Sequence, residues 1–381
     1  MGSWWILNPA SPFKPELFRV SLPSPASSLS AAFAAPLIAW QRTHGRHTLP
    51  WQQTTDPYRV WLSEIMLQQT QVTTVLGYYA RFLARFPDVR ALAEASQDDV
   101  LALWSGLGYY SRARNMHACA KAVVERFGGE FPRSSELLQS LPGIGRSTAA
   151  AIAAFCYGER VAILDGNVKR VLTRFLAYDA DLAVAANERR LWDRATEMLP
   201  DDGIEAYTQG IMDLGATVCL PRAPQCLVCP VQPGCEGRRD GAPERFPVKT
   251  RKLKRGRREN AWLWLVRDDR LWLVQRPDSG VWAGLWSFPE FDSVDALRSA
   301  ASGWPGAAEV LEPFKHVLTH LDWMLQPVVW RLPAKTAARD VAGITATLPD
   351  GRWVTRDEAL AMGVPSPLRK LLERAPPSAG A

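Results

Sequence analysis

The residue pattern of the chain changes once, at a basic run that separates a helix-like part from a strand-like part. Between Arg238 and Arg258 the sequence carries ten Lys and Arg against two acids, together with Pro and Gly and without an apolar period. Such a run is typical of a linker between domains. A chain of 381 residues is also too long for one ordinary core. We therefore predict a basic linker over 238–260, whose charge fits either a solvated segment or a contact with nucleic acid.

Two domains of different class are expected on either side of this linker. Residues 31–237 show the apolar spacing, caps and short polar turns of successive helices, whereas 261–370 suggest a smaller α+β domain. Within the latter, AWLWLVRDDRLWLVQRP predicts two strands around an Asp-Asp turn. Residues 1–30 are rich in Pro and Ser and lack a basic segment followed by a continuous apolar one. We expect a disordered extension there, and a disordered tail over 371–381.

The overall composition is that of an ordinary globular protein with a basic balance. Hydrophobic residues make up 47% and charged residues 22% of the chain, and no stretch approaches the roughly 18 apolar residues of a membrane helix. The net charge of +6 is compatible with a polyanionic partner. We expect no membrane association and a cytoplasmic location, nucleoid-associated if the source is bacterial.

Four of the six cysteines fall within the seventeen residues CLPRAPQCLVCPVQPGC, with the spacing C-x6-C-x2-C-x5-C. They are Cys219, Cys226, Cys229 and Cys235. Thiolates held this close repel one another unless a metal neutralises them, and both zinc and a 4Fe-4S cluster accept four thiolates. Zinc ribbons usually show two C-x2-C pairs, whereas here one pair is tight, so the spacing favours one 4Fe-4S cluster. Cys119 and Cys156 lie in apolar helix-like runs, which predicts buried core thiols.

The stretch LPGIGRSTAAAIAAF, residues 141–155, places Gly143 and Gly145 between two helix-like runs. Backbone N–H groups at the start of a helix form a phosphate site. This is the helix-hairpin-helix pattern of DNA binding without sequence specificity, although a plain connection between helices produces similar sequences.

Two carboxylates have surroundings that suit acid–base chemistry. Glu64 lies in the helix-like stretch 56–86 beside Trp61, Leu62 and other apolar residues. A carboxyl group against apolar surface should have a raised pKa, which suits a general acid, unless the side chain reaches solvent. Asp165, in LDGNVKRVL, precedes a helix-like run and is either an N-cap or a carboxylate aimed into a cleft.

Taken in this order, these features resemble the endonuclease III superfamily of helix-hairpin-helix DNA glycosylases. Within it the chain is similar to the adenine DNA glycosylases, the MutY family. The resemblance covers about residues 36–370 and rests on PWQQTTDPYRVWLSEIMLQQTQV, GLGYYSRARN, LPGIGRSTAAAI, ILDGNVKRVL and the cysteine segment. It implies a mainly α glycosylase domain with an iron-sulfur loop, followed by a Nudix-like domain.

The resemblance implies removal of adenine mispaired with 8-oxoguanine or guanine, acting on a nucleotide flipped out of duplex DNA. Glu64 would protonate the adenine, Asp165 would stabilise the sugar cation by its charge or by a transient covalent bond, and Asn167 would assist. The cluster would organise a DNA-docking loop and take no part in hydrolysis. Ser147, in the substrate site, stands where bifunctional members carry a Schiff-base lysine, so we expect no lyase activity. The neighbouring Arg146 stays protonated and cannot replace it.

The same resemblance assigns residues that would contact the substrate. Those around the adenine pocket are Arg46, Trp51, Leu67 and Gln209. Gln69 and Tyr109 would enter the duplex near the lesion pair. The ordinary alternative for Trp51 and Leu67 is the core, and for Tyr109 an exposed position.

The C-terminal part resembles the Nudix fold most clearly in RPDSGVWAGLWSFPEF. The following DSVDALRSAASGWPG lacks the closely spaced acids of a Nudix metal site, so we expect no pyrophosphate hydrolysis. Where the family usually has Phe-Ser-His for reading the lesion, this chain has Leu318, Thr319 and His320. Thr319 keeps a hydroxyl group for a hydrogen bond, whereas Leu318 removes an aromatic contact. Thr319 and His320 are predicted DNA contacts.

Three other functions compete with this interpretation. An endonuclease III-like enzyme for oxidised pyrimidines is disfavoured by the missing lysine and the added domain. A non-catalytic DNA-binding protein would have lost Glu64 or Asp165, and a Nudix hydrolase would need the acidic site. We expect a monomer that binds duplex DNA with adenine mispairs.

Overall fold

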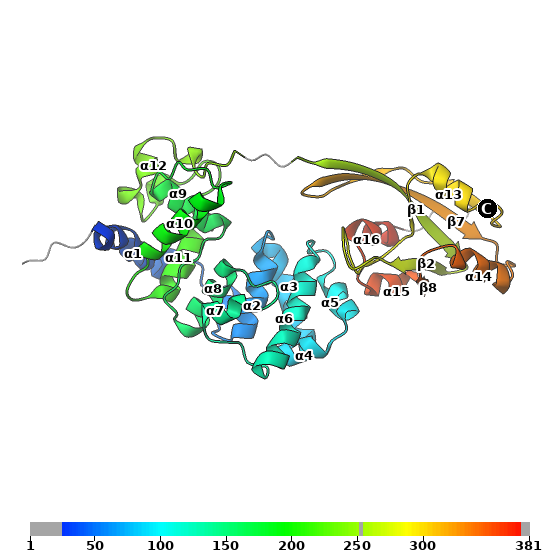
Figure 1. Cartoon of the computed structure of the whole chain (residues 1–381), viewed down its shortest axis with the longest axis horizontal. Coiled ribbons are helices and arrows are strands. Elements are labelled where there is room, and N and C mark those ends of the chain that lie inside the picture. The colour runs from blue at the N-terminus through cyan, green and yellow to red at the C-terminus, as the bar shows by residue number, and fades with distance from the viewer. Residues whose placement is uncertain (1–24, 251–253, 375–381) are drawn as a thin grey trace, which may run out of the picture.

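Helices form the first part of the chain and a mixed sheet the last part (Figure 1). The computed structural model describes residues 25–250 and 254–374. The helices of the first part are α1 (Pro25–His44), α2 (Pro57–Leu67), α3 (Val72–Arg85), α4 (Val89–Glu94), α5 (Gln97–Trp104), α6 (Ser111–Phe127), α7 (Ser135–Gln139), α8 (Arg146–Tyr157), α9 (Gly166–Phe175), α10 (Ala185–Glu197), α11 (Ile204–Thr217) and α12 (Glu236–Arg239). The predicted helical character of this part is confirmed.

The helical domain has two lobes, each with its own apolar core. One core gathers side chains of α1 and α9–α11, and the other those of α2–α6. Helix α8 belongs to both, because its alanines alternate between them: Ala149 and Ala153 face one core, whereas Ala150 and Ala154 face the other. Small side chains let the lobes approach on either side of one helix.

The helix-like stretch 56–86 is two helices rather than one. Asp56 caps α2 by accepting a hydrogen bond from the Tyr58 N–H group, and Pro57 occupies the first turn. The chain then leaves the helix at Gln68, and Gln69 adopts a left-handed conformation with φ of 55°. The break contains neither Gly nor Pro. Hydrogen bonds from the distant Arg112 stabilise it instead.

The C-terminal domain is built on one eight-stranded mixed sheet with the order β3-β2-β1-β7-β5, where β4 pairs with β1, β6 with β7 and β8 with β2. Its strands are β1 (Gly256–Arg267), β2 (Arg270–Gln275), β3 (Trp286–Ser287), β4 (Glu290–Phe291), β5 (Ala307–Val310), β6 (Phe314–Val317), β7 (Leu321–Leu332) and β8 (Gly351–Thr355). Its helices are α13 (Val294–Ala300), α14 (Ala338–Ala346), α15 (Arg356–Ala361) and α16 (Ser366–Glu373). The predicted β1–β2 hairpin is confirmed, and β1 also pairs in parallel with β7 over its whole length.

The two domains share an interface that continues the core of the α2–α6 lobe. That core also includes buried side chains of the sheet and of α16. Asp98 on α5 accepts hydrogen bonds from Trp286 Nε1 (3.2 Å) and Gln275 Nε2 (3.4 Å). Just before α16, the Val364 carbonyl accepts one from the Tyr110 hydroxyl group (3.2 Å). In Figure 1 the C-terminal domain accordingly lies beside α5 and α6.

Three predicted boundaries differ from the structure. Helix α1 begins at Pro25, so residues 25–30 are helical rather than part of a disordered extension, and α16 reaches Glu373, inside the predicted tail. The predicted linker begins inside α12 and ends inside β1, which starts at Gly256 because β7 pairs with it from there. Residues 1–24, 251–253 and 375–381 lie outside the described residues. Among the helices that are described, none combines the length and apolarity needed to span a membrane.

Candidate active site

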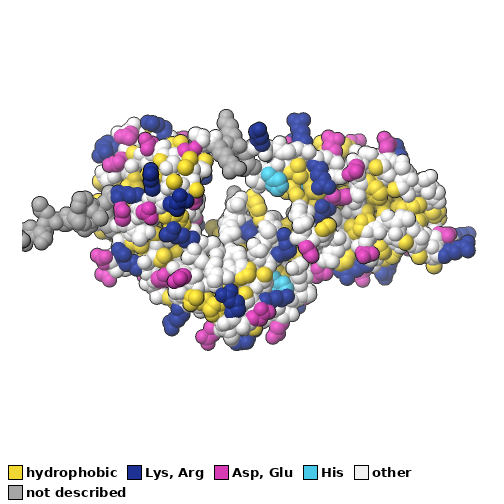
Figure 2. Space-filling view, in the orientation of Figure 1, with side chains coloured by type: hydrophobic (Ala, Val, Ile, Leu, Met, Phe, Trp, Pro, Cys, Tyr) yellow, Lys and Arg dark blue, Asp and Glu magenta, His cyan; other side chains and the backbone are white. Residues whose placement is uncertain are grey.

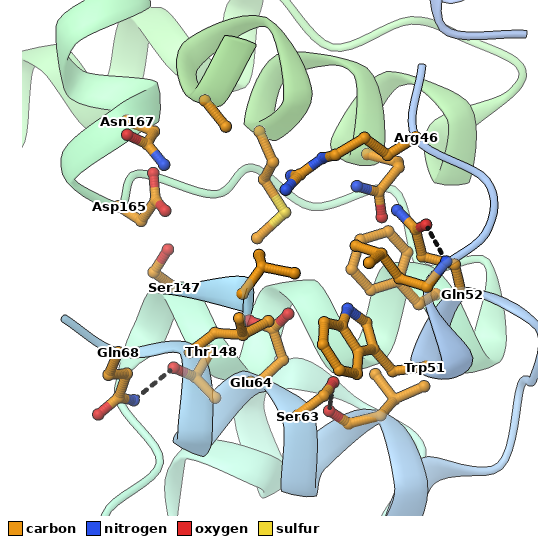
Figure 3. A pocket seen from close by; sticks show the side chains of 18 of the residues that line it. Arg46, Trp51, Gln52, Ser63, Glu64, Gln68, Ser147, Thr148, Asp165 and Asn167 are labelled. Atoms are coloured by element: carbon orange, nitrogen blue, oxygen red, sulfur yellow. Dashed lines mark hydrogen bonds between the residues drawn. The ribbon is translucent and has the colours of Figure 1, made fainter. Parts of the chain in front are cut away.

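A cavity of about 1190 Å³ lies between the two lobes of the helical domain. Its walls come from α2, the turn after α2, the start of α8, the start of α9 and one face of α11. It brings together nine of the residues singled out in the sequence: Arg46, Trp51, Glu64, Leu67, Gln69, Ser147, Asp165, Asn167 and Gln209. Figure 3 shows Glu64 and Asp165 on opposite sides of the same space, with Ser147 between them.

Glu64 projects from α2 into this cavity. Burial, together with the nearby charge of Asp165, raises the pKa of its carboxyl group to about 8. The carboxyl group is therefore largely protonated at neutral pH and can donate a proton to a bound base. The prediction of a raised pKa is confirmed, because flanking apolar residues on α2 such as Trp61 and Ile65 are buried.

Asp165 has both of the roles that its place in the sequence allows. Its Oδ1 accepts a hydrogen bond from the Val168 N–H group (2.7 Å), so it caps α9, and its carboxylate also lines the cavity. Burial raises the pKa of Asp165, against the lowering effect of two backbone N–H groups and of Arg170 and Lys169. The positive end of the α9 dipole favours a charged carboxylate at this place.

Asn167 is fixed by two neighbours, one on its own helix and one on α11. Its Oδ1 accepts a hydrogen bond from Arg170 Nη2 (2.9 Å). Its Cβ lies so close to Gly215 that a methyl group added to this glycine would stand 2.7 Å from it. Arg170 in turn donates from Nε to the Cys219 carbonyl (2.7 Å), which connects the start of α9 to the cysteine segment.

The far wall of the cavity carries Arg46 and Gln209, which converge on Asp213. Arg46 donates to this carboxylate from its backbone N–H group (2.9 Å) and from Nε (2.7 Å), and Gln209 donates from Nε2 (2.9 Å). Trp51 is buried and packs edge-on against Tyr79, so it is both a core and a cavity residue. Sequence reasoning missed Asp213, because its partner Arg46 lies 167 residues away.

Gln69 and Tyr109 share an unusual backbone. Both have positive φ, 55° and 47°, and both side chains are exposed. The buried Arg112 holds both segments: its Nη1 donates to the carbonyls of Met66 (3.0 Å) and Gln68 (2.6 Å). Its Nη2 donates to the carbonyls of Leu107 and Gly108. The stretch GLGYYSRARN did not reveal the role of this arginine, because α6 carries several other charged residues and nothing local distinguishes Arg112 from them.

Comparison with known proteins decides the family. Residues 62–196 match the model of the HhH-GPD superfamily base excision DNA repair proteins, and residues 261–374 match that of the NUDIX domain. The adenine DNA glycosylase of Buchnera aphidicola subsp. Baizongia pistaciae is 34% identical over 348 residues, which cover 90% of this chain and 96% of that protein. The chain belongs to the adenine DNA glycosylase family.

Other relatives agree with membership of the adenine DNA glycosylase family. The adenine DNA glycosylase of Homo sapiens is 32% identical over 407 residues, covering 89% of this chain and 73% of that protein. A solved structure of a thermostable thymine-DNA glycosylase superposes with a TM-score of 0.50 and 25% identity, covering 56% of this chain and 98% of that one. The chain is thus a DNA N-glycosylase of base excision repair, with a helix-hairpin-helix domain followed by a Nudix domain.

Five of the predicted DNA contacts of this glycosylase lie outside the cavity: Tyr109 and the four residues described next. Gly143 and Gly145 are exposed between α7 and α8. Gly143 has a positive φ of 75°, and a Cβ there would stand 2.7 Å from that of Asn115. Thr319 and His320 form the exposed turn between β6 and β7. The Thr319 and Tyr109 hydroxyl groups are 2.9 Å apart, so this turn reaches the helical domain.

The four predicted metal ligands line one small apolar cavity beside α9, together with Arg174 and Arg238. Burial, together with the three other thiols, raises the pKa of Cys229 to about 12, so thiolates here need a neutralising cation. No three His, Cys, Asp or Glu side chains converge on one metal-ion position anywhere in residues 25–250 and 254–374. Four cysteine thiolates are a donor set that suits a 4Fe-4S cluster and equally a zinc ion.

The two remaining cysteines differ from one another. Cys119 is buried in α6, as predicted, and burial raises the pKa of its thiol to about 12. Cys156 is only half-buried, contrary to prediction, because it stands in the last turn of α8 where the helix leaves the core.

Proposed function

We propose that the enzyme hydrolyses the N-glycosidic bond of adenine opposite 8-oxoguanine or guanine in duplex DNA, without lyase activity. The observation that carries this proposal is the pairing in one cavity of a carboxyl group protonated at neutral pH, Glu64, with a helix-capping carboxylate, Asp165. Cleavage of an N-glycosidic bond needs a proton on the leaving base and negative charge beside the cationic sugar.

Glu64 is the general acid in this proposal. A flipped adenine in the cavity has ring nitrogens that accept the Glu64 proton, after which the neutral base leaves. The pKa of about 8 keeps the proton on Glu64 until the base arrives.

Asp165 faces the sugar from the start of α9. Its charge stabilises the oxocarbenium-like state, either through space or by a transient covalent bond to the sugar carbon. Asn167, held by Arg170 and Gly215, orients the water or the sugar beside it.

Ser147 supports a monofunctional enzyme. Its Oγ accepts a hydrogen bond from the Leu164 N–H group (3.1 Å), which engages the hydroxyl group in positioning the segment before Asp165. Among the described residues that line the cavity there is no lysine, and hence no amine to form a Schiff base with the sugar.

Recognition of the opposite base is assigned to the segments around Tyr109 and Thr319, with Gln69 filling the space of the flipped adenine. The hydrogen bond between Tyr109 and Thr319 supports this proposal, because it places residues of both domains side by side. Gly143 and Gly145 supply backbone N–H groups to a DNA phosphate. Figure 2 shows Lys and Arg distributed over both domains among acidic side chains, rather than gathered into one patch.

One 4Fe-4S cluster on the four cysteines completes the proposal, and would fix the cysteine segment against α9 and DNA. It predicts about four iron atoms per chain, whereas a zinc site predicts about one zinc. We also propose a monomer in the cytoplasm, associated with duplex DNA.

The test is single-turnover cleavage of a duplex with one 8-oxoguanine:adenine pair, read with and without alkali. Scission of the adenine strand only after alkali supports a monofunctional glycosylase. Scission without alkali would contradict the absence of lyase activity, and equal cleavage of adenine opposite thymine would contradict the proposed mispair specificity.

A further inference from the structure

Asp213 is a fully buried carboxylate that stands behind the cavity without lining it. It lies on α11, one turn after Gln209. Its Oδ2 accepts a hydrogen bond from the backbone N–H group of Arg46. Its Oδ1 accepts hydrogen bonds from Arg46 Nε and from Gln209 Nε2. Arg46 Nη2 is also 2.6 Å from Oδ1. One carboxylate therefore fixes the two polar side chains of the cavity's far wall.

The carboxylate determines which way the Gln209 amide faces. A carboxylate oxygen only accepts hydrogen bonds, so the NH₂ group of Gln209 must point to Asp213. Its carbonyl oxygen, Oε1, is left free to accept, and no residue of the described structure donates to it. Because Gln209 lines the cavity, the wall offers a bound base a fixed acceptor.

Arg46 complements this acceptor with a fixed donor. Its backbone N–H group, Nε and one N–H of Nη2 face Asp213, so both N–H groups of Nη1 and one of Nη2 are left over. A guanidinium group has no acceptor. Asp213 thus holds one acceptor and one donor next to each other.

This arrangement distinguishes purine bases by their C6 substituent. Adenine has an amine at C6, which donates, and ring nitrogens that accept, whereas guanine and hypoxanthine have an oxygen at C6. An oxygen facing Gln209 Oε1 would leave two buried acceptors without a donor, which is unfavourable. Sites of this kind reject the mismatched analogue strongly.

We propose that Asp213 is the positioning residue that makes the cavity select adenine, by orienting the Gln209 amide as an acceptor and fixing Arg46 beside it. The inference rests on the proposed function, because it takes the base in the cavity to be adenine. The competing explanation is that Asp213 merely neutralises the half-buried Arg46 and supports the fold.

The experiment compares Asp213→Asn with the wild-type enzyme on duplexes with adenine or unsubstituted purine opposite 8-oxoguanine. Purine lacks the C6 amine, so it cannot use the Gln209 acceptor. The amide that replaces the carboxylate in this variant can accept or donate, which releases the Gln209 amide to turn. We expect the single-turnover rate on adenine to fall about 10–100-fold and the adenine/purine rate ratio to fall at least about tenfold.

Two further variants separate orientation from stability. Gln209→Met leaves the Arg46–Asp213 ion pair in place. It should reduce the adenine/purine rate ratio as much as Asp213→Asn does. In the double variant Gln209→Glu/Asp213→Asn the side chain at position 209 has only acceptors, so the ratio should return to within about threefold of wild type. Asp193→Asn, which changes an exposed carboxyl group on α10, is the matched control and should change nothing.

The outcomes are distinct. Equal loss on adenine and purine in Asp213→Asn, or an unchanged ratio in Gln209→Met, would overturn the inference and leave a purely structural carboxylate. Failure of the double variant to restore the ratio would also overturn it. A wild-type enzyme that releases no adenine would overturn the proposed function itself, and this inference with it.

Discussion

Gly215 shows how strongly the site depends on single side chains. This glycine on α11 contacts the backbone and Cβ of Asn167, which allows the start of α9 to lie directly on α11. Any side chain at 215 would move Asn167 and, with it, the cap residue Asp165 two positions earlier. At this scale the chemistry is set by distances of a few tenths of an ångström.

Gly215→Ala should therefore slow adenine release about 10–100-fold in single turnover, because a Cβ 2.7 Å from that of Asn167 forces α9 away. The loss of stability should be about 1–3 kcal/mol, measured by urea unfolding. Gly343→Ala is the matched control, since a Cβ on α14 would meet open space. A Gly215→Ala enzyme with the wild-type rate would show that Asn167 is not held as described.

The sequence predicted the residues whose roles are local and missed those whose partners are distant. Glu64 could be found from its apolar neighbours, and Asp165 from its place before a helix. Asp213 and Arg112 could not be found in this way, because the partners of each lie on elements far away in the sequence.

At the scale of elements, α9 and the break after α2 organise the site. Helix α9 presents Asp165 and Asn167 at its start, and one and two turns later Arg170 and Arg174 bind the cysteine segment. Helix boundaries here followed caps that the sequence displays, such as Asp56 and Asp165. The break at Gln69 was not predicted, since Arg112, more than forty residues away, satisfies the carbonyls that a continuing helix would have bonded.

Arg112→Lys should destabilise the two segments that Arg112 connects, residues 65–70 and 107–108. An ammonium group cannot reproduce a fork that donates to five carbonyls and to Thr70 Oγ1. We expect the free energy of unfolding to fall by about 2–3 kcal/mol, measured in urea. In the control variant Arg126→Lys, which changes an exposed residue of the same helix, the free energy of unfolding should fall by less than about 0.5 kcal/mol. Equal decreases in the two variants would refute the special role of Arg112.

At the scale of the whole molecule, the two domains form one unit across a shared core. The division into a helical domain and an α+β domain could be predicted from the change of apolar period. The docking of the sheet on α5 and α6 could not, because its contacts, such as those of Asp98 with Trp286, leave no periodic trace in either segment. The parallel pairing of β1 with β7 is equally invisible locally.

Asp98→Ala tests this docking. Removal of the carboxylate leaves the Trp286 indole N–H without its acceptor and removes one of the two acceptors of the Gln275 amide, so stability should fall by about 1–2 kcal/mol. The neighbouring Asp99→Ala loses only an exposed ion pair with Arg85 and should cost less than about 0.5 kcal/mol. Indistinguishable thermal unfolding of the two variants would mean that these bonds do not hold the domains together.

The most direct test of the whole account is the pH dependence of single-turnover adenine release. In the proposed mechanism Glu64 must be protonated to act, and its pKa of about 8 lies well above that of an ordinary glutamate. The rate should therefore be level below about pH 8 and fall about tenfold per pH unit above it, and Glu64→Gln should be slower by about 10²–10⁴-fold throughout. A wild-type rate that stays level to about pH 10, or a Glu64→Gln enzyme with the wild-type rate, would contradict Glu64 as the general acid.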